Sequence, residues 1–137
     1  MTKTNPIIVK AIDRLNARKD RSKWNKAVTD FAYDLLMDID EAIQDGYFDA
    51  EDLNAPKLLT RAMLNGAQDW QQYAWGGCGL VYDGDIAEAL CTPSELKRTR
   101  NGERRPNSRE EWLDVYARAM GQACARAKAA IRGAINE

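Results

Sequence analysis

The amino-acid sequence predicts an all-α fold, a compact single-domain bundle of about five to seven helices over residues 1–137. Apolar residues recur at spacings of three and four along most of the chain, as on the buried face of a helix. Residues that cap helices stand at the ends of these stretches. No segment combines alternating polarity with strand composition, and the one short candidate for a strand or hairpin lies between Gly79 and Tyr82.

The first half of the chain contains two long helical patterns. Asn5 and Pro6 are an N-cap and a first helical residue, and the helix that they begin is expected to end near Asp20. The second pattern is expected to continue to Gly46, where glycine favours a helix end. Its apolar face is formed by Trp24, Val28, Phe31, Leu35 and Ile39. Both patterns predict amphipathic helices that bury one face.

Shorter elements are expected in the middle of the chain. Residues 49–53 have the composition of a turn or short helix, and Asn54 with Pro56 begins another helix that stops before Gly66. Asp83 or Asp85 is expected to cap a short helix that carries Leu90. The sequence therefore predicts several short helices between the two longest ones.

Two capping boxes predict further helix starts, one from Thr92 to Glu95 with Pro93 at the first helical position, and one from Ser108 to Glu111. The helix after the second box is expected to run almost to the carboxyl end. Its stripe of apolar and small residues, which permits close helix packing, comprises Trp112, Tyr116, Ala119, Met120, Ala123, Ala127, Ala130, Ile131 and Ala134.

Composition places the chain among ordinary globular proteins, with 45% hydrophobic residues, 30% charged residues and a formal net charge of −1. The first residues contain only a short apolar run, too short for a signal peptide or a membrane span, so a cytoplasmic location and no membrane partner are expected. The three cysteines have no metal-like spacing and are expected to be reduced thiols.

The sequence contains no histidine. Histidine is the usual general base at neutral pH and the commonest metal ligand, so its absence removes most catalytic triads and zinc sites. We therefore expect no catalytic residues, no metal and no cofactor, and a protein that is not an enzyme.

An unusual run, WQQYAWGGCGLVYDGD, extends from Trp70 to Asp85. Its large aromatic residues favour a corner of the core, and Cys78 is expected to be a buried, inert thiol. The alternative is a ligand loop, since glycines let the backbone approach an anion or a planar ring closely. The residues of this possible loop are Trp75, Gly76, Gly77 and Tyr82.

Charge is segregated along the chain despite the small net charge. Basic residues that could contact a partner or nucleic acid precede the last helix: Lys97, Arg98, Arg100, Arg104 and Arg105. Acidic residues crowd the end of the second helix and the segment after it: Asp38, Asp40, Glu41, Asp45, Asp49, Glu51 and Asp52. Either cluster could face a charged partner, or the basic residues could pair with the acidic segment or with Glu103, Glu110 and Glu111 of the same chain.

The segment from Trp70 to Ala119 contains WGGC, CTPSELKR and NGERRPNSREEWLDV. In these motifs it resembles a family of short uncharacterised proteins carried by prophages, plasmids and conjugative elements of intestinal bacteria. The resemblance implies that the protein travels with mobile DNA, where small proteins include inhibitors of host defence, such as anti-CRISPR proteins, and proteins that serve replication or transfer.

Together these features favour a non-enzymatic binding protein that inhibits a host defence nuclease, with that protein or its nucleic-acid complex as partner. Two alternatives stay open: a nucleic-acid-binding accessory protein for replication or transfer, and a small-ligand-binding module at the loop of Trp75 and Tyr82.

Overall fold

The structure, a computed structural model, describes residues 4–63, 88–98, 102, 104–106 and 108–137. Its class is all-α, as predicted, with a single pair of very short strands in the described residues. The named elements are α1 (Pro6–Asn16), α2 (Lys23–Gln44), the 3-10 helix η1 (Ala50–Asn54), β1 (Lys97–Arg98), β2 (Arg104–Arg105) and α5 (Arg109–Ile135). Residues 56–63 and 88–90 are also helical.

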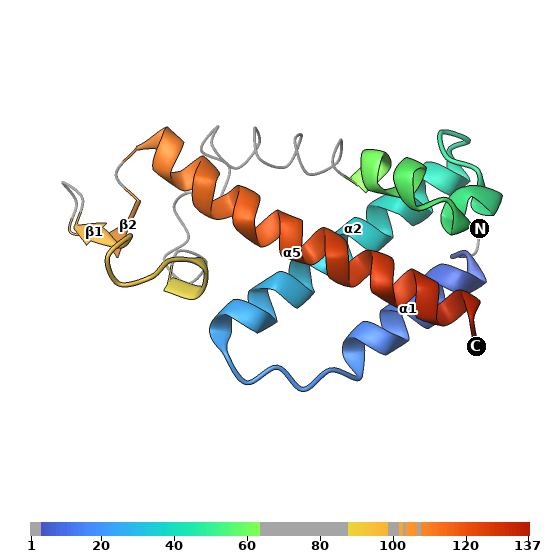
Figure 1. Cartoon of the computed structure of the whole chain (residues 1–137), viewed down its shortest axis with the longest axis horizontal. Coiled ribbons are helices and arrows are strands. Elements are labelled where there is room, and N and C mark those ends of the chain that lie inside the picture. The colour runs from blue at the N-terminus through green and yellow to red at the C-terminus, as the bar shows by residue number, and fades with distance from the viewer. Residues whose placement is uncertain (1–3, 64–87, 99–101, 103, 107) are drawn as a thin grey trace.

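Helix α5 is the centre of the bundle and crosses both α1 and α2 (Figure 1). Ser108 is its N-cap, and the Ser108 side chain accepts a hydrogen bond of 3.2 Å from the backbone N–H of Glu111, as the capping box predicted. The helix continues to Ile135, which confirms that it runs almost to the last residue. Its predicted apolar stripe is buried throughout, including the alanines at 119, 123, 127, 130 and 134.

Helix α1 begins as predicted but ends early. The Asn5 side chain accepts a hydrogen bond of 2.9 Å from the backbone N–H of Ile7, and Pro6 occupies the first turn. The expected end near Asp20 is wrong, because the helix stops at Asn16. Residues 17–22 are ARKDRS and add no large apolar side chain to the buried face, so tertiary packing does not extend the helix.

Helix α2 has the predicted core face and the predicted end. Ser22 caps its first turn, and Gly46 adopts a φ of 80°, the left-handed conformation that glycine permits after a helix. Its carboxyl-terminal part is tied to α1 by Asp40, which is only 2% exposed. Asp40 accepts hydrogen bonds from the backbone N–H of Asn5 (2.8 Å) and from the Gln44 amide (2.5 Å).

The core joins all three long helices. Phe31 of α2 meets Tyr116 of α5 edge to face, with ring centroids 5.7 Å apart, and Trp112 lies 6.3 Å from Tyr116. The short elements pack on the same core, since Leu53 of η1, Leu59 and Met63 are buried. The predicted short helices after α2 are thereby confirmed as η1 and residues 56–63.

The helix predicted to start at the first capping box, from Thr92 to Glu95, is not formed. The backbone N–H of Thr92 donates to the Glu95 carboxylate (2.8 Å), as in a capping box, but a turn replaces the predicted helix. The reason lies in the next residues, because Leu96 is followed directly by β1, which pairs with β2. The hydrogen bond of the capping box therefore forms, but the following residues pair as a strand and do not continue a helix.

The basic residues that precede the last helix form a hairpin, which the sequence did not predict. Strands β1 and β2 are antiparallel, with Lys97 opposite Arg105 and Arg98 opposite Arg104. Gly102, with a φ of 79°, supplies the left-handed conformation between them. The strand predicted between Gly79 and Tyr82 lies outside the described residues.

The run from Trp70 to Asp85 also lies outside the described residues. The predictions on Trp75, Gly76, Gly77, Cys78 and Tyr82, and the helix cap expected at Asp83 or Asp85, therefore stay predictions. Among the helices that the structure describes, none has both the length and the apolar composition required to cross a membrane.

The buried indole of Trp112 leads to a test of the core. Trp112 is 2% exposed, so Trp112→Ala removes a large buried side chain and is expected to lower the free energy of unfolding by about 3–5 kcal/mol. Urea denaturation followed by circular dichroism measures this loss. Tyr47, which is 87% exposed, is the control, and Tyr47→Ala should change stability by less than about 0.5 kcal/mol. Equal effects of the two variants would contradict the packing described for α5.

Candidate functional site

The solvent side of α2 carries a row of carboxylates. Asp30, Asp34, Asp38 and Glu41 follow one another at spacings of four and three residues, and this places them along one side of the helix. Asp30 and Glu41 are exposed, whereas Asp34 and Asp38 are half-buried at the edge of the core. At 1.5 Å per residue the row is about 16 Å long. Together with the neighbouring Tyr33 and Met37, these four residues are here named the acidic face of α2.

The carboxylates of the acidic face have no countercharge in the described part of the chain. None of them takes part in an ion pair or a hydrogen bond there, whereas five other ion pairs involving acidic residues are found in the same part. Burial raises the pKa of Asp34, and the nearby Asp30 raises it further. Burial likewise raises the pKa of Asp38, with added repulsion from Asp34 and Glu41. The ionised forms of Asp34 and Asp38 therefore disfavour the folded state.

Two apolar side chains are interleaved with the carboxylates. Tyr33 is 40% exposed and Met37 is 37% exposed, one helical turn apart. Aromatic residues and methionine are enriched in protein interfaces, where they supply contact area between charged groups. The acidic face thus combines charge for attracting a basic partner with apolar surface for holding it.

Part of this surface was predicted and part was missed. The predicted acidic segment included Asp38 and Glu41, which belong to the face, and Asp40, which is buried and structural. Asp30 and Asp34 were missed, although their spacing of four residues along one side of the helix was visible in the sequence. Beyond α2, Asp45, Asp49 and Glu51 are exposed, as expected for the acidic segment.

The basic hairpin brings together the described members of the predicted basic site. Lys97, Arg98 and Arg104 are exposed, and Arg105 belongs to β2, whereas Arg100 lies outside the described residues. Because Arg98 and Arg104 are directly opposite in an antiparallel pair, they share one face of the hairpin. Figure 1 shows the hairpin beyond the amino-terminal end of α5. The predicted pairing within the chain also occurs, because Lys97 Nζ lies 2.5 Å from Glu111 Oε1.

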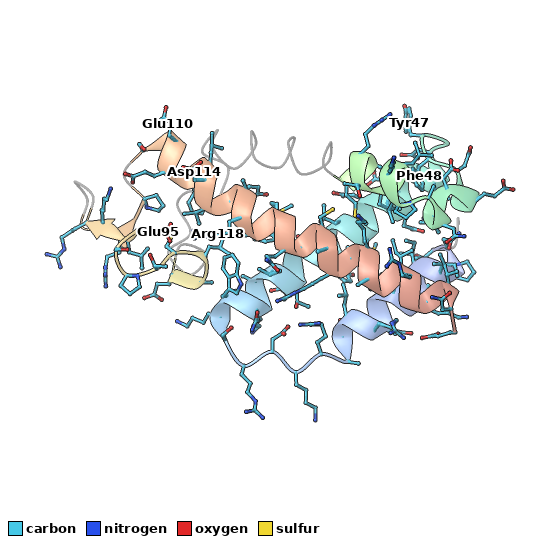
Figure 2. All side chains as sticks on the ribbon, viewed as in Figure 1. Tyr47, Phe48, Glu95, Glu110, Asp114 and Arg118 are labelled. Carbon is cyan, nitrogen blue, oxygen red and sulfur yellow. The ribbon has the colours of Figure 1, made fainter. Side chains whose placement is uncertain are left out.

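An arginine clamp fixes the chain that leads into the hairpin. Arg118 Nη2 lies 3.0 Å from Glu95 Oε1 and donates to the carbonyl of Leu90 at 3.3 Å. Its guanidinium also lies 5.7 Å from the centroid of the Trp24 ring. The bond from Arg118 lowers the pKa of Glu95, which keeps the carboxylate ionised for the pair. Figure 2 shows Glu95 and Arg118 facing each other beside the turn.

The described residues offer no obvious reactive group. Burial raises the pKa of Cys91 to about 11, and burial also raises the pKa of Cys124, so both thiols stay protonated at neutral pH. Within the described ranges, no group of three or more acidic or cysteine side chains could hold a metal ion.

Comparisons of the chain with protein-family models, with curated proteins and with solved structures find no match.

The raised pKa values predict a gain in stability on neutralising the row. Because the folded state holds the protons of Asp34 and Asp38 more tightly than the unfolded chain, stability falls as pH rises through their pKa values above 3.8. Asp34→Asn with Asp38→Asn should therefore raise the unfolding free energy at pH 7, by about 0.2–0.5 kcal/mol for each relieved pair. Urea denaturation should show this gain shrinking as the pH approaches 4.

The control for that measurement is Asp49→Asn with Glu51→Gln, two exposed carboxylates outside α2. This pair should change stability by less than about 0.5 kcal/mol and without the same pH dependence. A loss of stability at pH 7 in the Asp34 and Asp38 variant would mean that these carboxylates support the fold.

The hairpin gives a separate prediction. If its basic residues contact phosphates, Arg104→Ala with Arg105→Ala should weaken binding to duplex DNA and make the slope of log affinity against log salt shallower by about 0.9 per lost contact. Fluorescence anisotropy over a salt series measures both quantities. An unchanged salt slope would exclude a phosphate contact at these arginines. Asp49→Asn, at an exposed acidic position, is the control.

Proposed function

We propose that this protein is a non-enzymatic binding protein of a mobile genetic element. In this proposal it inhibits a host defence nuclease, as anti-CRISPR proteins do, by occupying the basic groove in which the nuclease holds nucleic acid. The observation that carries the proposal is the acidic face of α2, whose carboxylates have no countercharge in the described residues. The origin on a mobile element rests on the motifs between Trp70 and Ala119.

The chemistry of a nucleic-acid groove supports this choice of partner. Such grooves carry lysine and arginine side chains that neutralise successive phosphates, so a row of carboxylates on a rigid helix offers them equivalent partners. Opposite charge also accelerates the encounter and orients the two proteins. Tyr33 and Met37 would then bury apolar area in the middle of the contact.

The energetics of α2 point in the same direction. Desolvation and mutual repulsion of Asp34 and Asp38 disfavour the folded state in the free protein. Surfaces that reduce stability are characteristic of functional sites, because binding uses groups that the free fold leaves unsatisfied. A basic partner would supply the missing countercharge and lower both pKa values.

A second candidate function is a nucleic-acid accessory role in replication or transfer. It is favoured by Arg98 and Arg104, which are exposed and share one face of the hairpin. The third possibility, a ligand loop at Trp75 and Tyr82, rests on residues outside the described ranges.

The main proposal is tested by capturing partners from a lysate of the bacterial host, with the protein as bait. The lysate is first treated with nuclease to remove nucleic acid that could bridge bait and partner. We expect a nucleic-acid-binding nuclease to be retained, and its purified form to be inhibited by the wild-type protein. The bait with Asp30→Asn, Asp34→Asn, Asp38→Asn and Glu41→Gln should bind that nuclease at least about tenfold more weakly. Circular dichroism checks that its helices are intact.

A matched control separates this surface from net charge. The control bait carries Asp13→Asn, Asp45→Asn, Asp49→Asn and Glu51→Gln, which also removes four negative charges from exposed positions. It should retain the nuclease and inhibit it. If both baits lost binding to the nuclease equally, the effect would be one of net charge. If the only partners recovered were ones that disappear on nuclease treatment, the accessory role would be favoured.

A further inference from the structure

A groove lies between α1, the connection that follows it and α5, on a part of the surface that the proposed function does not use. Its volume is about 500 Å³. Three arginines line it, and small residues of α5 form much of the remaining wall. The residues that define this arginine groove are Arg14, Arg18 and Arg126 with Ala125, Ala129 and Ala130.

Arg126 is held in place by neutral acceptors. Its guanidinium donates to the Asn25 carbonyl (2.9 Å), the Asn25 side-chain oxygen (2.8 Å) and Thr29 Oγ1 (3.1 Å). Thr29 Oγ1 in turn donates a hydrogen bond of 2.7 Å to Asp20. Partial burial lowers the pKa of Arg126, and the nearby Arg18 lowers it further, whereas Asp20 acts in the opposite direction.

The carboxylates of the groove balance only part of this charge. Asp20 Oδ1 lies 3.6 Å from Arg18 Nε, and Glu137 Oε1 lies 3.0 Å from Arg14 Nη1. Three guanidinium groups thus face two carboxylates. Exposed cations follow Arg18 in the connection and in the first turn of α2: Lys19, Arg21 and Lys26, which have no ion pair among the described residues.

From this arrangement we infer that the arginine groove binds phosphate groups of a nucleic-acid strand. A guanidinium group can donate two hydrogen bonds to two oxygens of one phosphate. The small alanine side chains leave room for a group of nucleotide size beside the arginines. The cations at Lys19, Arg21 and Lys26 could contact further phosphates. A nucleic-acid strand carries such successive phosphates, whereas a free phosphate ion does not. The inference is independent of the acidic face of α2 and of the hairpin, which lies apart from the connection in Figure 1.

Gly133 gives this inference a test that leaves net charge unchanged. The Arg14 guanidinium lies directly over Gly133, and a Cβ added there would fall within 2.5 Å of Arg14 Cζ. Gly133→Ala therefore displaces the flexible end of Arg14 from its position. Gly121 lies in the same helix with open space around it, so Gly121→Ala is a matched control. Alanine favours a helix over glycine, so neither change is expected to impair folding.

The experiment measures binding of the full chain to a short fluorescein-labelled single-stranded DNA, and to RNA of the same sequence, by fluorescence anisotropy. Arg14→Gln with Arg18→Gln should weaken binding at least about tenfold, since charge-assisted hydrogen bonds are lost. The slope against log salt should become shallower by about 0.7 per lost contact. Gly133→Ala should weaken binding severalfold, and Gly121→Ala should not.

Two further variants keep this result separate from the other surfaces. Lys57→Gln with Arg61→Gln removes two exposed charges outside all three surfaces and should bind the strand as the wild-type protein does. Arg98→Gln with Arg104→Gln, the hairpin variant, is measured beside it. Absence of binding by the wild-type protein at low salt would overturn the inference. The inference would also be overturned if the hairpin variant weakened binding and the Arg14 and Arg18 variant did not. It would likewise be overturned if a mononucleotide bound as tightly as the strand. Self-association that the Arg14 and Arg18 variant abolishes would instead assign the groove to a second copy of the chain and overturn it.

Discussion

The close packing of α5 across α1 and α2 is the interaction on which the rest of the structure depends. Ala119, Ala123 and Ala127 have no exposed surface, and their small side chains let the backbones of the helices approach closely. Trp112 and Tyr116 fill the wider space near the start of α5, where Phe31 of α2 meets them. Each charged surface is defined by this crossing, because it determines which sides of α1, α2 and α5 remain outside the core.

The crossing produces opposite charge on different surfaces of one small bundle. On α2 one side is the acidic face, where the described residues supply no countercharge and both partial burial and neighbouring carboxylates raise the pKa of Asp34 and Asp38. Between α1 and α5, Arg14 and Arg126 meet beside the alanines of α5. One helix crossing thus separates a surface that favours basic groups from a surface that favours anionic groups.

The helices were largely predictable from the sequence because their signals are local. Caps at Asn5 and Ser108 and apolar spacing along α2 and α5 act within a few residues of each helix. The turn at Thr92 and the basic hairpin were not predictable in the same way, because strand pairing overrides a local helix signal. The arginine groove was also missed, since Arg126 and its partner Asn25 are 101 residues apart and meet only through the crossing of helices. The acidic face, by contrast, was visible as regular spacing in one helix.

Zero-length carbodiimide crosslinking of the captured complex tests the central claim most directly, because it joins a carboxylate to a lysine that is already in contact with it. The account predicts crosslinks from Asp30, Asp34, Asp38 or Glu41 to lysines in the nucleic-acid groove of the nuclease, identified by mass spectrometry. These crosslinks should disappear when nucleic acid fills the groove first. Crosslinks confined to carboxylates outside α2, such as Glu110 or Asp114, would contradict the assignment of the acidic face as the binding surface.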